Sequence, residues 1–164
     1  VNFYIENNVV SEQNYAKNKN VNSFLCCESE EINYVINEIN RTNFGLLLDT
    51  AHLKVSSATL GLEKEKEVEE ILDKIKVIHH SDNDGTVDSN EPLDNGYWFL
   101  KFKKYYSLWD HVIEVKNIDP NTINKQIEIP LKAYKTLRIT FFFIFVCINI
   151  DCRINYKSCY YFTD

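Results

Sequence analysis

Four short hydrophobic segments of this chain each end in a side chain that can bind a metal ion. The four terminal residues are Glu6, Asp49, His79 and Glu114. Side chains alternate between the two faces of a strand, so each of these residues shares a face with the residue two positions before it. Two glutamates, one aspartate and one histidine offer hard oxygen atoms and one imidazole. This set of ligands suits a divalent metal ion.

The segments that would position these side chains alternate between strand and helix. Apolar residues at positions 32, 35, 36 and 39 form one stripe, as do those at 68, 71, 72 and 75, and such stripes indicate helices. We expect loops over 7–27, 50–62 and 81–96. We expect strands over 2–6, 44–49, 76–80 and 111–116, with helices from 28 onward and over 63–75, 97–108 and 120–137.

Four successive strand–helix units predict an α/β fold with a parallel sheet and outer helices. Each unit spans about 30–40 residues, as in a (β/α)8 TIM barrel, so about four βα units make a partial barrel. Parallel strands in a barrel have their carboxyl ends at one mouth. The side chains at the four strand ends are therefore expected to converge there.

Composition indicates a soluble globular protein. The chain has 164 residues, of which 45% are hydrophobic and 26% charged, with a net charge of -6. An acidic balance disfavours a general nucleic-acid surface. Five cysteines without a regular framework favour reduced thiols and a cytoplasmic protein, and the N-terminus has no signal-peptide pattern.

Two features suggest that the chain is a fragment. It contains no methionine, and it opens with Val1 directly in a strand pattern. We therefore expect residues 1–137 to be half of a barrel and 138–164 to be an anomalous hydrophobic, Cys- and Tyr-rich tail. The tail is too short to span a bilayer. It is either non-native sequence or a final hydrophobic strand or helix that covers an exposed edge.

Further polar residues follow two of the strands. Asp49 and His52 form a D-x-x-H pattern, in which the chain would bend so that both side chains reach the mouth. His79 is expected to point inward and His80 outward, toward the helices. Asp82 and Asp88 lie in the next loop, where a carboxylate could orient the His79 imidazole from behind.

These residues, in this order, resemble the xylose-isomerase-like barrel superfamily, which includes sugar (phosphate) isomerases and epimerases and endonuclease IV. The resemblance covers about residues 2–137. It rests on I-E-N at 5–7, G-L-L-L-D-T-A-H at 45–52, I-H-H-S-D-N-D-G-x-x-D at 78–88 and V-I-E-V at 112–115. It implies that the chain carries strands five to eight of the barrel.

The resemblance also implies a function and roles for the site residues. Glu6, Asp49, His79 and Glu114 would hold a divalent metal, which could be Mn, Mg, Co or Zn. Glu6 and Glu114 would act as acid and base, and His52 would contact a sugar or sugar phosphate. The reaction is proton transfer next to a carbonyl through an enediolate, which needs a positioned base and a stabilising cation. The fragment alone is expected to have little activity.

Two alternatives remain open. The first is an endonuclease IV-like, zinc-dependent nuclease for abasic DNA. Such nucleases carry a D-x-H after strand seven, whereas this chain has Asp88, Ser89 and Asn90 there. The second is a non-catalytic half-barrel, which would leave open strand edges. A half-barrel is expected to form a homodimer or to pair with a missing N-terminal half, and no membrane partner is expected.

Overall fold

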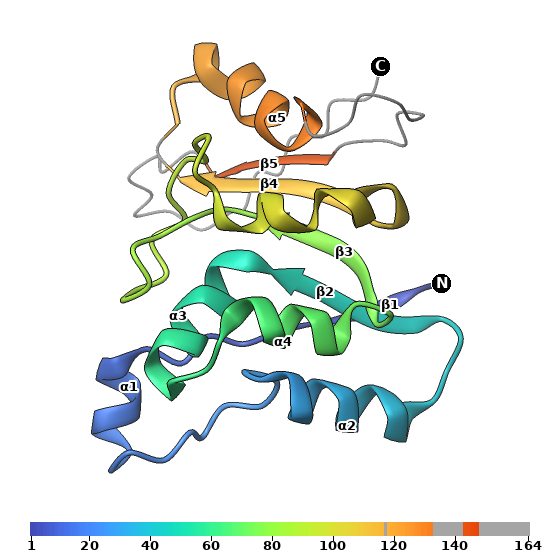
Figure 1. The fold of residues 1–164 in the computed structure, drawn as a ribbon, viewed down its shortest axis with the longest axis vertical. Coiled ribbons are helices and arrows are strands. Elements are labelled where there is room, and N and C mark those ends of the chain that lie inside the picture. Colours follow the sequence, from blue (N-terminus) through green and yellow to red (C-terminus); the bar gives the residue numbers. More distant parts are fainter. Residues whose placement is uncertain (117, 133–142, 148–164) are drawn as a thin grey trace, which may run out of the picture.

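The computed structural model describes residues 1–116, 118–132 and 143–147 of the chain. Its centre is a parallel sheet whose strands follow one another in chain order, and their arrows point the same way in Figure 1. The strands are β1 (Phe3–Glu6), β2 (Phe44–Asp49), β3 (Ile75–His80), β4 (Asp110–Lys116) and β5 (Phe143–Cys147).

Helices connect these strands, as expected for parallel neighbours, which need a crossover connection. They are α1 (Glu12–Lys17), α2 (Ser29–Ile39), α3 (Thr50–Leu60), α4 (Lys64–Ile71), the 3-10 helices η1 (Trp98–Leu108) and η2 (Pro120–Thr122), and α5 (Ile123–Lys132). Helices α3, α4 and η1 lie in front of the strands in Figure 1. The prediction of an α/β fold with a parallel sheet and flanking helices is confirmed.

The hydrophobic core lies between the helices and one face of the sheet. Alternate residues of the strands, such as Leu46, Leu48 and Ile78, are fully buried in this core. Helices contribute the facing apolar side chains, among them Ile32, Leu53, Val68, Ile71, Phe99, Phe102 and Tyr106. Because side chains alternate along a strand, Glu6, Asp49, His79 and Glu114 point to the other face of the sheet.

The loop predicted for residues 50–62 is wrong, because α3 occupies most of it. Asp49 begins this helix as a side-chain cap, and Gly61 ends it with a positive φ of 71°. The helix has no apolar stripe because it is buried on several sides, and its buried residues include small polar ones such as Ser56 and Ser57. A search for periodicity therefore misses it.

Other boundaries differ less. The predicted loop 7–27 contains the short helix α1, which Ser11 caps by accepting a hydrogen bond from the backbone N–H of Asn14. The helix predicted over 63–75 ends at Ile71, and β3 starts at Ile75. Of the helix predicted over 120–137, residues 133–137 lie outside the described residues.

The tail 138–164 is described only over β5, which pairs in parallel with β4. This pairing agrees with the alternative of a final hydrophobic strand that covers the edge of β4. Over the described ranges, no helix combines the length and apolar character needed to cross a bilayer.

Candidate metal centre

The structure brings the four predicted metal ligands together at the carboxyl ends of their strands. Glu6 ends β1, Asp49 ends β2, His79 lies one residue before the end of β3, and Glu114 lies two before the end of β4. Each offers one ligand atom, and these four atoms all lie within 4.8 Å of one another. The cluster could hold a metal ion.

The register of the sheet explains why residues from four strands meet. Asp49 and His79 are direct neighbours across β2 and β3. Glu6 pairs with Leu47, two residues before Asp49, and His79 pairs with Val112, two residues before Glu114. Offsets of two preserve the face on which a side chain lies. All four ligands therefore point to the same side of the sheet.

His79 lies at the centre of the cluster. Its Nδ1 atom is 2.7 Å from Glu114 Oε2, 3.1 Å from Glu6 Oε1 and 3.8 Å from Asp49 Oδ2. Despite these short distances, Nδ1 has no partner with hydrogen-bond geometry within the described part of the chain. These contacts are ion pairs when His79 is protonated, and a metal cation could take the place of that proton among the same atoms.

Asp49 has two separate roles, one for each oxygen of its carboxylate. Oδ1 accepts hydrogen bonds from the backbone N–H groups of Ala51 and His52 and so caps α3. Oδ2 is buried and has no hydrogen-bond partner among the residues that the structure describes. A buried carboxylate oxygen without a partner is costly. A metal ion at the cluster would remove this cost.

Burial and neighbouring charges shift the pKa values of the cluster in different directions. Burial raises the pKa of Asp49 to about 6, against the opposing effect of His52. Burial lowers the pKa of His79, but the carboxylates of Glu114 and Glu6 outweigh it and raise that pKa to about 9. Contact with His79 lowers the pKa of Glu6 despite its partial burial. Without a metal ion, a protonated His79 therefore offsets part of the negative charge of the carboxylates at neutral pH.

His52, the predicted substrate contact, lies beside this cluster. Its Nδ1 atom is 2.8 Å from the backbone oxygen of Asn7, and its Nε2 atom is 3.4 Å from Asp88 Oδ2. Burial lowers its pKa, but Asp88 and Asp49 raise it to about 9. His52 is thus presented at the strand ends as a cation, and its contact with a substrate stays a prediction.

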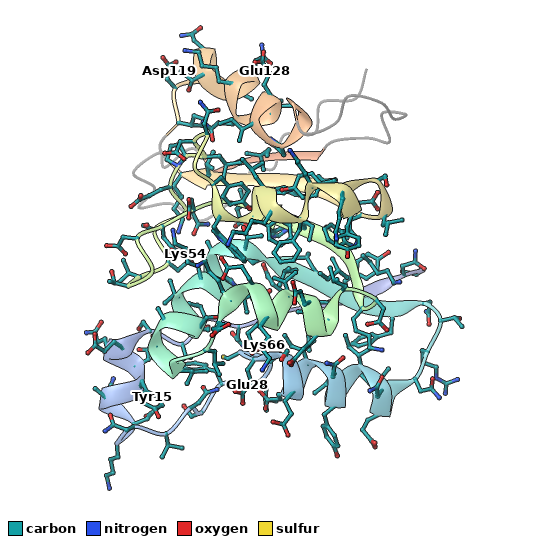
Figure 2. The ribbon with its side chains drawn as sticks, in the orientation of Figure 1. Tyr15, Glu28, Lys54, Lys66, Asp119 and Glu128 are labelled. Atoms are coloured by element: carbon teal, nitrogen blue, oxygen red, sulfur yellow. The ribbon has the colours of Figure 1, made fainter. Side chains whose placement is uncertain are left out.

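Asp82 and Asp88, predicted to orient His79, take other partners. Asp82 pairs at 2.7 Å with Lys54 of α3, which lies beside the loop after β3 in Figure 2. Asp88 pairs with His52. Both carboxylates therefore form ion pairs with side chains of α3, because the loop after β3 folds toward this helix rather than back over His79.

Asn7 is a positioning residue that sequence reasoning missed. Its buried side-chain oxygen accepts a hydrogen bond from the Asp49 N–H at 2.6 Å, and its amide donates to the Asp49 carbonyl at 3.1 Å. Its own carbonyl holds His52. Asn7 thus continues the pairing of β1 with β2 past the end of β1. The only sequence signal was a polar residue directly after a strand-end glutamate.

Replacing Asn7 with alanine is expected to loosen the cluster. Two hydrogen bonds to the Asp49 backbone would be lost, which should reduce the free energy of unfolding by about 2 kcal/mol. Metal affinity should fall about tenfold, the usual effect of losing a group that orients a ligand. Denaturant unfolding and metal titration measure the two effects.

The matched control for this variant is Asn8→Ala, because the amide of Asn8 is exposed and donates only to the carbonyl of Leu25. This control should change neither quantity by a comparable amount. Equal effects of the two alanine variants would contradict the role given to Asn7.

Comparison of the chain with protein-family models, with curated proteins and with solved structures finds no match.

Proposed function

We propose that this chain carries the metal centre of a divalent-metal-dependent isomerase or epimerase that acts on a sugar or sugar phosphate. The observation that supports the proposal is the convergence of four ligand atoms within 4.8 Å at the carboxyl ends of four neighbouring parallel strands. In (β/α)8 barrels, active sites lie at this end of the strands. We further propose that the sheet is half of such a barrel.

The exposure of the ligands divides their roles. The side chain of Asp49 is 1% exposed, whereas those of Glu6 and Glu114 are 42% and 30% exposed. Asp49 can therefore serve the metal alone, and the two glutamates can also reach a substrate. The lowered pKa of Glu6 keeps it ionised at neutral pH, as a proton acceptor must be.

The proposed reaction moves a proton between carbon atoms or between the faces of one carbon. One glutamate takes the proton next to the carbonyl, and the electron pair of the broken C–H bond forms the double bond of an enediolate. The other glutamate starts protonated and gives its proton to the second carbon or to the opposite face of the same carbon, so the two glutamates end with their protonation states exchanged. A bound divalent cation would polarise the carbonyl and stabilise the negative charge that develops on its oxygen. His52, as a cation beside the cluster, would bind a substrate hydroxyl or phosphate.

Proton exchange in D2O tests this function without requiring full turnover. The chain, loaded with Mn²⁺, is incubated with a panel of aldoses, ketoses and their phosphates, and NMR follows loss of the proton next to the carbonyl. Exchange that needs Mn²⁺ and disappears in Glu6→Gln and Glu114→Gln is expected. No exchange with any sugar, despite bound metal, would contradict the proposal.

The nuclease alternative stays a prediction, and the amide of Asn90 lies against Asp88 rather than in the cluster. Phe3 and Tyr4 of the edge strand β1 are 61% and 38% exposed. We propose that this exposed edge pairs with a second copy of the chain or with a missing half.

A further inference from the structure

A network of hydrogen-bonded side chains runs through the core, on the opposite side of the sheet from the candidate metal ligands. Thr50 Oγ1 lies 2.6 Å from Tyr97 Oη, which lies 3.1 Å from His80 Nδ1. His80 Nε2 lies 2.7 Å from His111 Nδ1, and His111 Nε2 lies 2.8 Å from the carbonyl oxygen of Tyr106. This network therefore links α3, η1, β3 and β4.

This network is an unusual choice for the helix-covered side of a parallel sheet. The inner positions of such strands are ordinarily apolar. Here Thr50 and His80 are fully buried, and Tyr97 is 2% exposed. Burying polar groups costs free energy unless they are hydrogen-bonded, and a partly satisfied network is worse than an apolar core. The hydrogen bonds of this network therefore offset the cost of burying its polar groups.

The end of the network sets the direction of its hydrogen bonds. The carbonyl of Tyr106 can only accept, so His111 Nε2 carries a hydrogen. In neutral histidines the other ring nitrogen then accepts. His80 Nε2 must donate to His111, and Tyr97 Oη must donate to His80 Nδ1. From Tyr97 onward, the hydrogens therefore point toward Tyr106, and the single hydroxyl hydrogen of Thr50 is shared between Tyr97 Oη and the carbonyl oxygens of His79 and Ser81.

Three members of the network are close to a candidate metal ligand along the backbone. Thr50 follows Asp49 and His80 follows His79, and His111 lies on the same strand as Glu114. Thr50 Oγ1 also lies 3.1 Å from the carbonyl oxygens of His79 and Ser81. The hydroxyl of Thr50 thus touches the backbone of a ligand on the neighbouring strand.

We propose that Thr50, Tyr97, His80 and His111 are positioning residues that set the spacing of the strand ends carrying Asp49, His79 and Glu114. This inference rests on the proposed metal site. It assigns a function to the polar network: the strand ends are held together from the helix side, so that the ligands need not move when the metal binds. Preorganised ligands bind a metal more tightly than ligands that must be gathered.

Hydroxyl deletion at two points of the network tests this role. Thr50→Val keeps the shape of the side chain but removes the hydroxyl, and Tyr97→Phe removes only the phenolic oxygen. We expect each to weaken Mn²⁺ binding about tenfold, as for other groups that orient metal ligands. Thr50→Ser restores the hydroxyl and should restore the affinity. Titration of the full chain with Mn²⁺, followed by electron paramagnetic resonance, measures these values.

A core variant away from the network separates positioning from general loss of stability. Val68 is fully buried on α4, and Val68→Ala should lower the melting temperature while leaving Mn²⁺ affinity unchanged. In the metal-free protein, ¹⁵N NMR should find the hydrogen on Nε2 of both His80 and His111. Tyr97→Phe should shift the His80 signals, because the donor to its Nδ1 is removed.

The outcomes distinguish this inference from the proposed function. If the wild-type chain binds Mn²⁺ and Thr50→Val and Tyr97→Phe bind it equally well, the inference alone is overturned. The same holds if Val68→Ala weakens binding as much as they do, or if the hydrogens lie on Nδ1. If the wild-type chain binds no Mn²⁺, the proposed function fails and this inference with it.

Discussion

The Asp49→Asn variant is expected to lose metal binding while it keeps its fold. Asparagine retains an oxygen that can accept from the N–H groups of Ala51 and His52, so the cap of α3 persists. The amide nitrogen then replaces the ligand oxygen Oδ2. Loss of a group that only orients a ligand costs about 10- to 100-fold in affinity. Loss of a ligand itself should cost at least about 100-fold on the same scale.

Calorimetric titration with Mn²⁺ and thermal unfolding of the metal-free chain measure the two parts of this prediction. Two further variants serve as comparisons: one also removes the helix cap, and the other is a control away from the site. Asp49→Ala removes the cap as well and should cost about 1 kcal/mol of stability in addition. Asp110→Asn changes an exposed aspartate at the amino end of β4, far from the ligand end, and should bind metal normally. Wild-type affinity in Asp49→Asn would contradict the ligand role of Asp49.

Metal binding is expected to release a proton, and the affinity should rise steeply with pH. The pKa of His79 is about 9 in the metal-free fold, so a metal must displace its proton at neutral pH. Below that pKa, the affinity should rise about tenfold for each pH unit. Below about pH 6 the slope should steepen, because Asp49 then also binds a proton.

The sign of the stability change follows from the same shift. A histidine whose pKa is raised on folding contributes stability that is fully present below its unfolded pKa of 6.5. This contribution is lost as the pH rises toward 9. The metal-free chain should therefore become less stable over this range, and bound metal should restore the lost stability. Thermal unfolding across this pH range, with and without Mn²⁺, measures the change.

His52 provides the control for this pH dependence, because its pKa is also about 9 but it lies outside the ligand set. The His52→Gln variant should keep the slope of affinity against pH. Titrations in buffers of different ionisation enthalpy count the released protons. A metal affinity independent of pH between 7 and 8 would contradict the account of His79.

The convergence of the four candidate ligands could be predicted from sequence because two local rules suffice. Strand periodicity indicates which face a side chain takes, and parallel strands bring their carboxyl ends to one edge. Glu6, Asp49, His79 and Glu114 each end a clear apolar run. Their convergence needed only that neighbouring candidate ligands be offset along the strands by an even number of residues. The observed offsets are zero between Asp49 and His79, and two for the other neighbouring pairs. The outward direction of His80 followed from the same alternation and is confirmed by its complete burial in the core.

What could not be predicted depends on contacts between distant segments. Helix α3 was missed because burial on several sides removes the apolar stripe that marks a helix. Asn7 acts through the backbone of Asp49, 42 residues away, and nothing in its local sequence shows that pairing. The partners of Asp82 and Asp88 depend on where their loop folds against α3. Such loop placement is the least regular part of a fold.

The most direct test of the metal centre is anomalous diffraction from crystals of the chain grown or soaked with Mn²⁺. Data collected on both sides of the manganese absorption edge locate the ion without assumptions about the ligands. We expect one strong peak per chain, between Glu6, Asp49, His79 and Glu114, with the Asp49 Oδ2 atom turned toward it. A peak elsewhere, or none at these four residues in a fully formed sheet, would contradict the central claim.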